Sequence, residues 1–185
     1  MPADGSVPPG ATKWHWEDVY ATRGARRVSW FQPEPDTSLA LIAELGTAPD
    51  AAIIDVGGGA SRLAGRLLAL GFTDVTVLDL SARSLEVARS EMGTHAAQVR
   101  WIEQDLLSWI PQRRYDLWHD RALFHFLVDP AHRERYLETL GAALRVGGRA
   151  LIATFAADGP DTCSGLPVAR YDADGLAAVF GAAFV

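Results

Sequence analysis

Ala52-Ile-Ile-Asp-Val-Gly-Gly-Gly-Ala-Ser61 is the stretch that decides the fold. Its first five residues form a short apolar run with a β-branched centre, which is typical of a buried strand in a parallel sheet. Three consecutive glycines follow, at positions 57 to 59. Because glycine has no Cβ, they allow the chain to turn sharply and its backbone to approach a ligand closely. We therefore expect a strand that ends at a ligand-binding turn.

The residues after this turn predict a helix and a second strand. Leucines recur at helical spacing after Ser61, and Gly71 ends the pattern. A strand over 75–78 then leads to Asp79. Strand, glycine turn, helix, strand and acid make a nucleotide-binding βαβ unit, in which the acid accepts hydrogen bonds from ribose hydroxyls.

The details of the turn indicate which nucleotide binds. The third glycine of the dinucleotide fingerprint would fall at position 62, which is Arg62. This disfavours an NAD-dependent oxidoreductase, which we keep as an alternative. Asp55 stands two residues before the first glycine, where a carboxylate suits a ligand that carries an ammonium group.

The pattern Asp55-x-Gly57-x-Gly59, with Asp79 downstream, resembles motif I and the acidic loop of class I S-adenosylmethionine-dependent methyltransferases. The resemblance continues at intervals to about Arg170. It implies an α/β fold with a doubly wound, mostly parallel sheet (a Rossmann-like methyltransferase fold) and S-adenosyl-L-methionine as cofactor. The complete family fold has seven strands, and the last two form an antiparallel hairpin. Here the chain reaches Val185 where strand six would begin, so we expect this hairpin to be lacking.

The resemblance also implies a cofactor site. In the family, the residue after the acid packs around the adenosine, which points to Leu80. An aspartate after the third strand hydrogen-bonds the exocyclic amine of adenine, and Asp105 follows the expected strand over 99–103. The expected cofactor-binding residues are Trp30, Asp55, Gly57, Gly58, Gly59, Ser61, Asp79, Leu80, Asp105, Leu106 and His119.

Candidates for the acceptor side follow the fourth expected strand, over 115–119. Ligands of open α/β sheets bind outside the carboxyl ends of the strands, at the point where the strand order reverses. We therefore expect His119, Asp120 and Arg121 to border the methyl-donor pocket, with His119 as a base and Arg121 beside the acceptor. Alternatively, Asp120 and Arg121 pair to hold the loop, and His125 is a core residue. These residues do not predict a metal site.

The N-terminal segment is rich in aromatic residues. We expect a flexible tail and an aromatic helical lid over 1–45, followed by the cofactor-binding domain over 46–185, as one domain overall. Trp16 and Tyr20 lie four residues apart on one helical face. Trp30 and Phe31 then either face the site as part of a lid or simply cover the edge of the sheet.

Helix-capping residues and loop residues predict the remaining elements. Asp36 is expected to cap a helix over 37–45, and a helix starting after Asp129 is expected to run through Leu144. Strand 149–155 and a long loop over 156–171 should follow, and Asp172 should cap the last helix. Cys163, in this loop, is expected to pack or to line the acceptor pocket.

Composition limits the function classes. The chain has 185 residues, 49% of them apolar, and a net charge of −6, which fits one acidic domain and argues against nucleic-acid binding. No apolar run has the length of a membrane span. Cys163 is the only cysteine, so no disulfide framework is expected. The N-terminus lacks the pattern of a signal peptide, and we expect a cytoplasmic protein.

These observations predict an enzyme that transfers a methyl group to a small-molecule acceptor or to a protein lysine. The sequence leaves a second reading open: an inactive, cofactor-binding module that acts through dimerisation or a partner. An unpaired edge at the fifth strand would favour association, so a homodimer is kept as an alternative.

Overall fold

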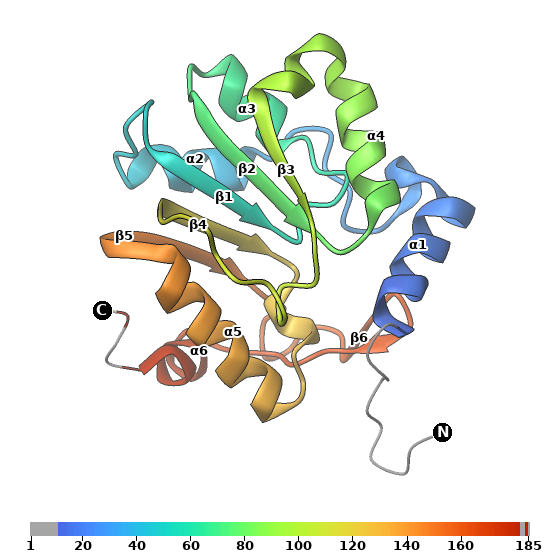
Figure 1. The fold of residues 1–185 in the computed structure, drawn as a ribbon. Helices are drawn as coiled ribbons and strands as arrows, with labels where there is room; N and C mark the ends of the chain where they lie inside the picture. Colours follow the sequence, from blue (N-terminus) through green and yellow to red (C-terminus); the bar gives the residue numbers. More distant parts are fainter. Residues whose placement is uncertain (1–10, 182–183, 185) are drawn as a thin grey trace.

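The strand at the glycine turn, β1 (Ala52–Val56), lies in the centre of a five-stranded sheet (Figure 1). This is seen in a computed structural model that describes residues 11–181 and 184. The strand order is β3-β2-β1-β4-β5 and all neighbours are parallel. The other strands are β2 (Asp74–Asp79), β3 (Val99–Glu103), β4 (Tyr115–Arg121) and β5 (Leu144–Ala153). From β1 the chain adds β2 and β3 on one side of the sheet, and then β4 and β5 on the other side. This strand order confirms the doubly wound fold.

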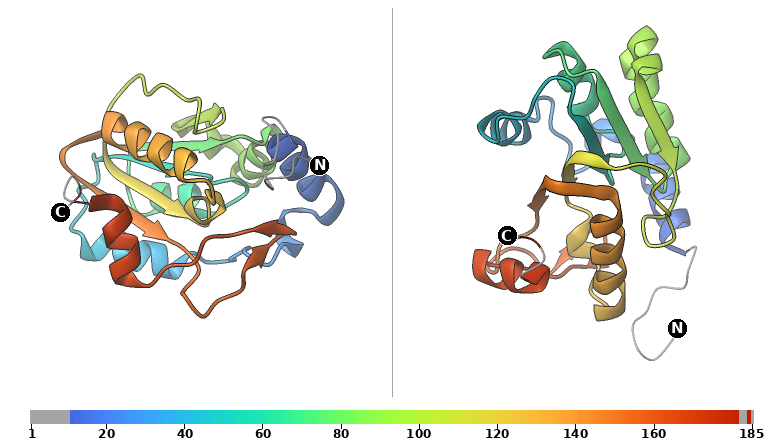
Figure 2. Two further views of the ribbon diagram at one scale, coloured as in Figure 1. Left: turned by 90° about the horizontal axis from the view of Figure 1, so that it is seen from below. Right: turned by 60° about the vertical axis from the view of Figure 1, so that its left-hand side comes forward.

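Helices cover both faces of this sheet (Figures 1 and 2). One face packs against α2 (Asp36–Glu44), α3 (Leu63–Ala69) and α4 (Ala82–Met92), and the other against α5 (Pro130–Ala143) and α6 (Ala173–Phe180). The first helix, α1 (Ala11–Arg23), lies near the carboxyl ends of the strands (Figure 1). The short helices are η1 (Ala25–Arg27), η2 (Gly93–Gln98) and η3 (Phe124–Phe126).

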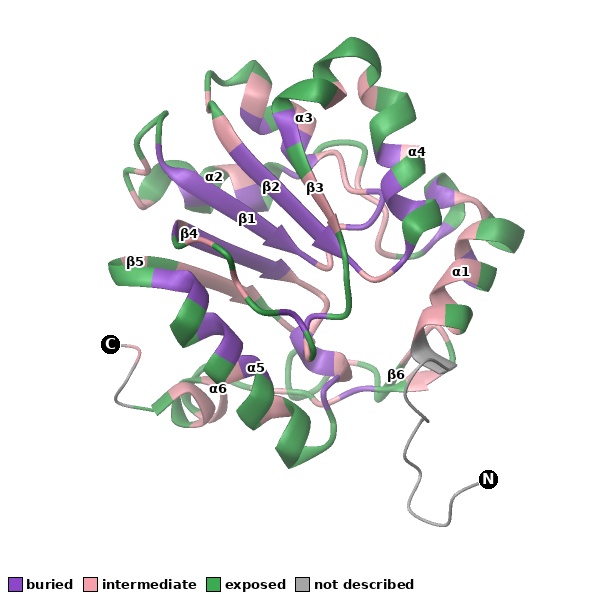
Figure 3. Ribbon diagram, viewed as in Figure 1, coloured by how far each residue is buried: buried purple, intermediate pink, exposed green. Residues whose placement is uncertain are grey.

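The alternation of side chains along the strands builds two cores. Ile53 packs with the α2–α4 face, whereas its neighbour Ile54 packs with the α5–α6 face. Both are fully buried, and all five residues of β1, including Asp55, are buried (Figure 3). Burial on both faces is the reason that four of the five residues of the strand are apolar.

A polar network crosses the core on the α5 side. The Tyr136 hydroxyl donates to Asp120 Oδ2 at 2.7 Å and accepts from Trp118 Nε1 at 2.9 Å, and all three residues are buried. A buried donor or acceptor that loses its partner costs about 1–3 kcal/mol. The network therefore ties β4 to α5 through a single hydroxyl.

Tyr136→Phe removes that hydroxyl and keeps the ring. We expect it to lower the free energy of unfolding by about 2 kcal/mol, because the Trp118 N–H loses its acceptor and the Asp120 carboxylate loses a donor. Urea denaturation of the wild type and the variant measures the difference. An unchanged midpoint would contradict this account of the network.

Several local features differ from the prediction. Helix α5 ends at Ala143, and β5 begins at Leu144 rather than at residue 149, because Leu144 is extended (ψ 141°) and pairs with Tyr115 of β4. Asp36 does not cap α2: it is the first helical residue, and Pro35 stands at the cap. The loop over 156–171 contains a short antiparallel hairpin, β6 (Thr162–Cys163) and β7 (Leu166–Pro167).

Side chains cap two further helices. Asp172 caps α6 by accepting from Gly175 N, as predicted, and Ser81 caps α4 by accepting from Ser84 N. Within residues 11–181 and 184, no further strand pairs with β5. No helix among these residues is long and apolar enough to cross a membrane. Most of the predicted N-terminal tail, residues 1–10, lies outside the part of the chain that the structure describes.

Candidate functional site

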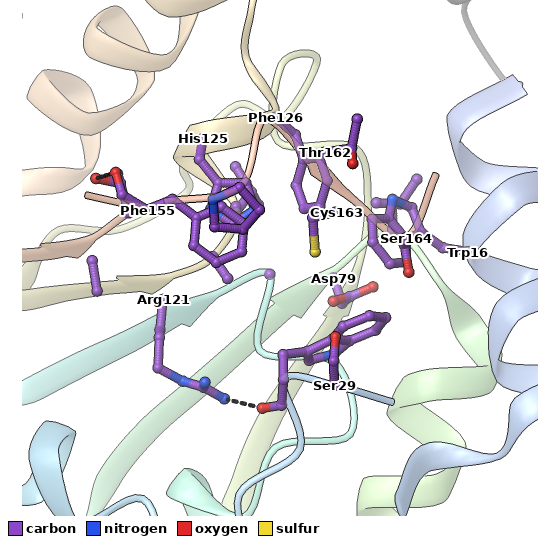
Figure 4. Close-up of a pocket in the computed structure, with 18 of the residues that line it drawn as sticks. Trp16, Ser29, Asp79, Arg121, His125, Phe126, Phe155, Thr162, Cys163 and Ser164 are labelled. Carbon is purple, nitrogen blue, oxygen red and sulfur yellow. Dashed lines mark hydrogen bonds between the residues drawn. The ribbon is translucent and has the colours of Figure 1, made fainter. Parts of the chain in front are cut away.

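A large cavity lies where β1, β2, β4 and β5 end (Figure 4). It measures about 520 Å³, and its wall combines α1, the glycine turn, the end of β2, the loop after β4 and the β6–β7 hairpin. A second cavity of about 180 Å³ shares Asp79 and Leu80 with it and extends to Asp105 and Leu106. The structure thus groups six of the predicted cofactor residues along one crevice: Trp30, Gly57, Asp79, Leu80, Asp105 and Leu106.

The glycine turn has the backbone shape that the sequence predicts. Gly57 and Gly59 have positive φ angles of 64° and 50°, which side chains rarely adopt. A Cβ at Gly59 would lie 2.7 Å from Tyr20 Oη and 3.3 Å from Asp79 Oδ2. A Cβ at Gly58 would collide with the Asp55 carboxylate beneath the turn. The turn therefore presents bare backbone next to an acid.

Asp79 ends β2 as a buried carboxylate. Its Oδ1 accepts from Ser81 N at 2.8 Å, and burial raises its pKa to about 6. Burial, together with the negative charge of Asp79, raises the pKa of the nearby Tyr20 to about 12. A carboxylate so poorly hydrated is stabilised by any ligand that brings hydrogen-bond donors, and ribose hydroxyls are such donors.

The turn after β3 carries the second acid. Asp105 is exposed, and its Oδ1 accepts from Leu107 N at 3.0 Å, whereas Leu106 is buried in the core. Both residues border the smaller cavity. This placement fits the predicted contact with adenine.

His119 lies away from the large cavity. It is buried between Asp55, whose Oδ1 is 2.7 Å from Nδ1, and Ser38, whose Oγ is 2.9 Å from Nε2. With both ring nitrogens engaged, His119 has none left to take a proton from an acceptor, and the structure does not favour it as a base. Together with Asp55, Gly58 and Ser61, it borders a hollow of only about 30 Å³ under the turn.

Asp120 and Arg121 do not pair, contrary to the alternative drawn from the sequence. Asp120 points into the core and accepts from Tyr136 and from Leu123 N, and its burial raises its pKa to about 6. Arg121 points to the cavity and donates from Nη2 to the Trp30 carbonyl at 3.1 Å (Figure 4). Within the described chain, no acidic side chain forms an ion pair with Arg121.

An aromatic cluster covers the cavity from the N-terminal side. Trp16 packs edge-on against Trp30 and Phe126, with ring centroids 5.5 and 5.2 Å apart, and Tyr20 also meets Trp30 edge-on. Phe31 instead borders the hollow of about 30 Å³ under the glycine turn. There the Arg62 guanidinium lies 5.7 Å from the centre of the Phe31 ring. The position of Trp30 fits the predicted lid, and that of Phe31 fits it less well.

Several wall residues were missed or undervalued from the sequence. His125, interpreted above as a core residue, lines the cavity without a hydrogen-bond partner at either nitrogen. Ala122 and Ser164 also line it, and they are the non-glycine residues with positive φ in the described chain, at 75° and 54°. Strained backbone of this kind gathers at functional sites. Among residues 11–181 and 184, no group of three potential metal ligands occurs.

Comparisons with known proteins agree with this geometry. A family model described as a methyltransferase domain matches residues 53–148. No curated protein sequence matches the chain. Among solved structures, one described by the conversion of a disulfide bond into a thioacetal group during echinomycin biosynthesis has a TM-score of 0.68 and 23% identity, covering 92% of this chain and 78% of that one.

Two further structures show the same fold. A complex of DhpI with SAM and HEP has a TM-score of 0.61 and 20% identity, over 85% of this chain and 70% of that one. A TehB-like SAM-dependent methyltransferase from Corynebacterium glutamicum has a TM-score of 0.56 and 24% identity, over 79% and 72% of the two chains.

Proposed function

This chain belongs to the methyltransferase domain family and is an S-adenosylmethionine-dependent methyltransferase, and from that premise we propose that its acceptor is a small molecule bound in the large cavity. The observation that carries the proposal is the juxtaposition of bare glycine backbone, buried Asp79 and an aromatic-walled cavity of about 520 Å³. Because α1 and the β6–β7 hairpin both contribute to this wall, it suits a compact acceptor better than a lysine on a folded protein.

The residues along the crevice fit the parts of the cofactor. Asp79 would accept hydrogen bonds from the ribose hydroxyls, Asp105 would accept from the adenine amine, and Leu80 would pack on the adenosine. Arg121, a cation without an acidic partner in the described chain, would hold the methionine carboxylate near Gly57. Asp55 lies under the turn at Gly58, and His119 holds its carboxylate there.

S-adenosylmethionine, when bound, supplies an electrophilic methyl carbon. The task of the chain is then to align the acceptor and to exclude water from it. Trp16, Trp30 and Phe126 form an apolar wall that can do both. The N-terminal segment would in this way act as a lid, held to the domain partly by exposed ion pairs such as Lys13–Glu103.

Titration calorimetry with S-adenosylmethionine and with NAD tests cofactor choice. We expect one site for S-adenosylmethionine, with a Kd on the order of micromolar, about −8 kcal/mol, and no heat from NAD. Release of S-adenosylhomocysteine with a panel of phenols, thiols, amines and lysine peptides then tests turnover. Release with peptides alone would contradict a small-molecule acceptor, and release with none would support the inactive module.

A further inference from the structure

Residues 28–34 run beside the glycine turn and contain no helix or strand, and we call them the strap. One backbone hydrogen bond joins two of its residues, from Phe31 N to the Val28 carbonyl at 3.1 Å. A segment with few backbone hydrogen bonds opens readily unless other elements hold it. Contacts with side chains of the domain must therefore fix the position of the strap.

Arg62, which immediately precedes α3, holds the strap from the side of the domain. Its Nη1 donates to the Pro33 carbonyl at 3.4 Å, and its guanidinium lies over the Phe31 ring. Its Nε pairs with the Glu91 carboxylate of α4 at 3.3 Å. A guanidinium can make these three contacts together because it has several donors in one plane and a face that stacks on aromatic rings. Arg62 thus joins the strap to α4.

The backbone at position 62 does not require glycine. This is the position of the third glycine in the dinucleotide fingerprint, but here φ is −88°, outside the region that favours glycine. The residue that distinguishes this turn from the fingerprint is therefore the one whose side chain reaches the strap.

The strap meets the candidate cofactor site at Trp30. The Trp30 carbonyl accepts from Arg121 Nη2 at 3.1 Å (Figure 4), and Arg121 is the residue to which we assign the methionine carboxylate. A long, flexible side chain binds a ligand more tightly when it is already held in its bound orientation. The orientation of Arg121 therefore depends on the Trp30 carbonyl, and the position of that carbonyl depends on the strap.

We propose that Arg62 is a positioning residue for the cofactor: it fixes the strap, and the strap sets the Trp30 carbonyl that orients Arg121 toward the methionine carboxylate. This inference rests on the proposed function and adds to it a residue outside the site. Arg62 is not among the described residues that line the large cavity or the cavity at Asp105, so it acts through the strap.

The exposure of these contacts indicates that Arg62 holds the strap rather than the whole fold. The side chains of Arg62 and Glu91 are 33% and 26% exposed. Partly exposed ion pairs contribute little to global stability. Loss of the guanidinium should therefore open the strap and leave the sheet and its helices folded.

Arg62→Met tests the proposal, because it removes the guanidinium and keeps an unbranched stem. Calorimetry compares S-adenosylmethionine with 5′-methylthioadenosine, which keeps the adenine, ribose and sulfur but has no carboxylate. We expect the Kd of S-adenosylmethionine to rise about tenfold, as it would if the strap were in place about a tenth of the time. The Kd of 5′-methylthioadenosine should stay within about twofold, because a ligand that does not contact Arg121 is indifferent to the strap.

Hydrogen exchange locates the change in the chain. In Arg62→Met the amides of the strap should exchange about tenfold faster, while those of the five-stranded sheet keep their protection. Tm should fall by no more than about 2 °C. Arg145→Met is the matched control: Arg145 Nη1 lies 2.6 Å from the partly exposed Asp116 carboxylate, at the amino ends of β4 and β5. This control should leave both affinities and the exchange of the strap unchanged.

A double-mutant cycle tests the route through Arg121. Arg121→Met should weaken S-adenosylmethionine binding by at least as much as Arg62→Met does. Adding Arg62→Met to it should weaken binding by less than about a further twofold, because both changes act through the same guanidinium. Additive losses would contradict this route.

Two other outcomes would overturn the inference and leave the proposed function intact. One is unchanged affinity of Arg62→Met for S-adenosylmethionine, and the other is an equal loss for both nucleosides. If Arg62→Met does not fold, Arg62→Lys gives the same comparison, because its ammonium keeps a charge beside Glu91 but lacks the planar group that reaches Pro33 and Phe31 together. A wild type that binds neither nucleoside would instead contradict the proposed function itself.

Discussion

Asp79→Ala is expected to weaken the binding of S-adenosylmethionine by at least about 100-fold, because hydrogen bonds to a charged group contribute about 1.5–3 kcal/mol each. Two ribose hydroxyls would donate to this one carboxylate. Calorimetry of the wild type and the variant measures the loss directly. Unchanged affinity would remove Asp79 from the cofactor site.

Asp79→Asn separates this role from a structural one. In the folded protein burial raises the pKa of Asp79 from 3.8 to about 6. The stability that comes from its protonated form is therefore fully present below about pH 3.8 and is lost as the pH rises through about 6. At pH 7 the free enzyme carries the cost of a buried charge, which the asparagine variant avoids.

The asparagine variant should thus bind cofactor poorly and yet have a Tm at pH 7 equal to or above that of the wild type. The difference in Tm should shrink toward pH 4, where both side chains are uncharged. Thermal denaturation across this range is the measurement. A variant that is less stable at pH 7 would indicate that Asp79 mainly supports the fold.

His119→Ala should destabilise the protein rather than remove a base. It leaves the buried Asp55 carboxylate without its partner at 2.7 Å and Ser38 without its partner at 2.9 Å. Breaking a buried pair of this kind costs about 3–5 kcal/mol. In a chain of this size that corresponds to a fall in Tm of roughly 10 °C. Cofactor affinity should fall with it, because Asp55 supports the glycine turn.

A double-mutant cycle with Asp55→Asn measures the coupling between the two side chains. We expect the effects on unfolding free energy to be non-additive by about 1–3 kcal/mol, as for residues in direct contact. His119→Asn, which keeps a donor toward Asp55, should recover part of the loss. A His119→Ala variant with wild-type Tm and cofactor affinity but a kcat lowered by about 10²-fold or more would instead identify His119 as the base.

Local signals explain why the βαβ unit could be predicted. Each of its signals can be recognised from a few neighbouring residues: the mostly apolar strand β1, the glycines after it, and Asp79 at the end of β2. The boundary between α5 and β5 could not be found in this way, because Leu144 fits the apolar stripe of the helix as well as the start of the strand.

The direction of the side chains after β4 depends on contacts far apart in the sequence. His119 faces Asp55 because β4 pairs with β1 in that register, and this also turns Asp120 to the opposite face of the sheet. One strand alone does not reveal its register. The position of His125 in the cavity wall could not be predicted for a similar reason: the turn before it requires a positive φ at Ala122, a conformation that alanine rarely adopts.

A crystal structure of the protein with S-adenosylhomocysteine tests the central claim most directly. We expect both ribose hydroxyls within hydrogen-bond distance of the Asp79 carboxylate, with the sulfur beside the glycine turn and facing the large cavity. A nucleoside bound elsewhere, or a ribose held by other residues while Asp79 stays in contact only with protein, would contradict it.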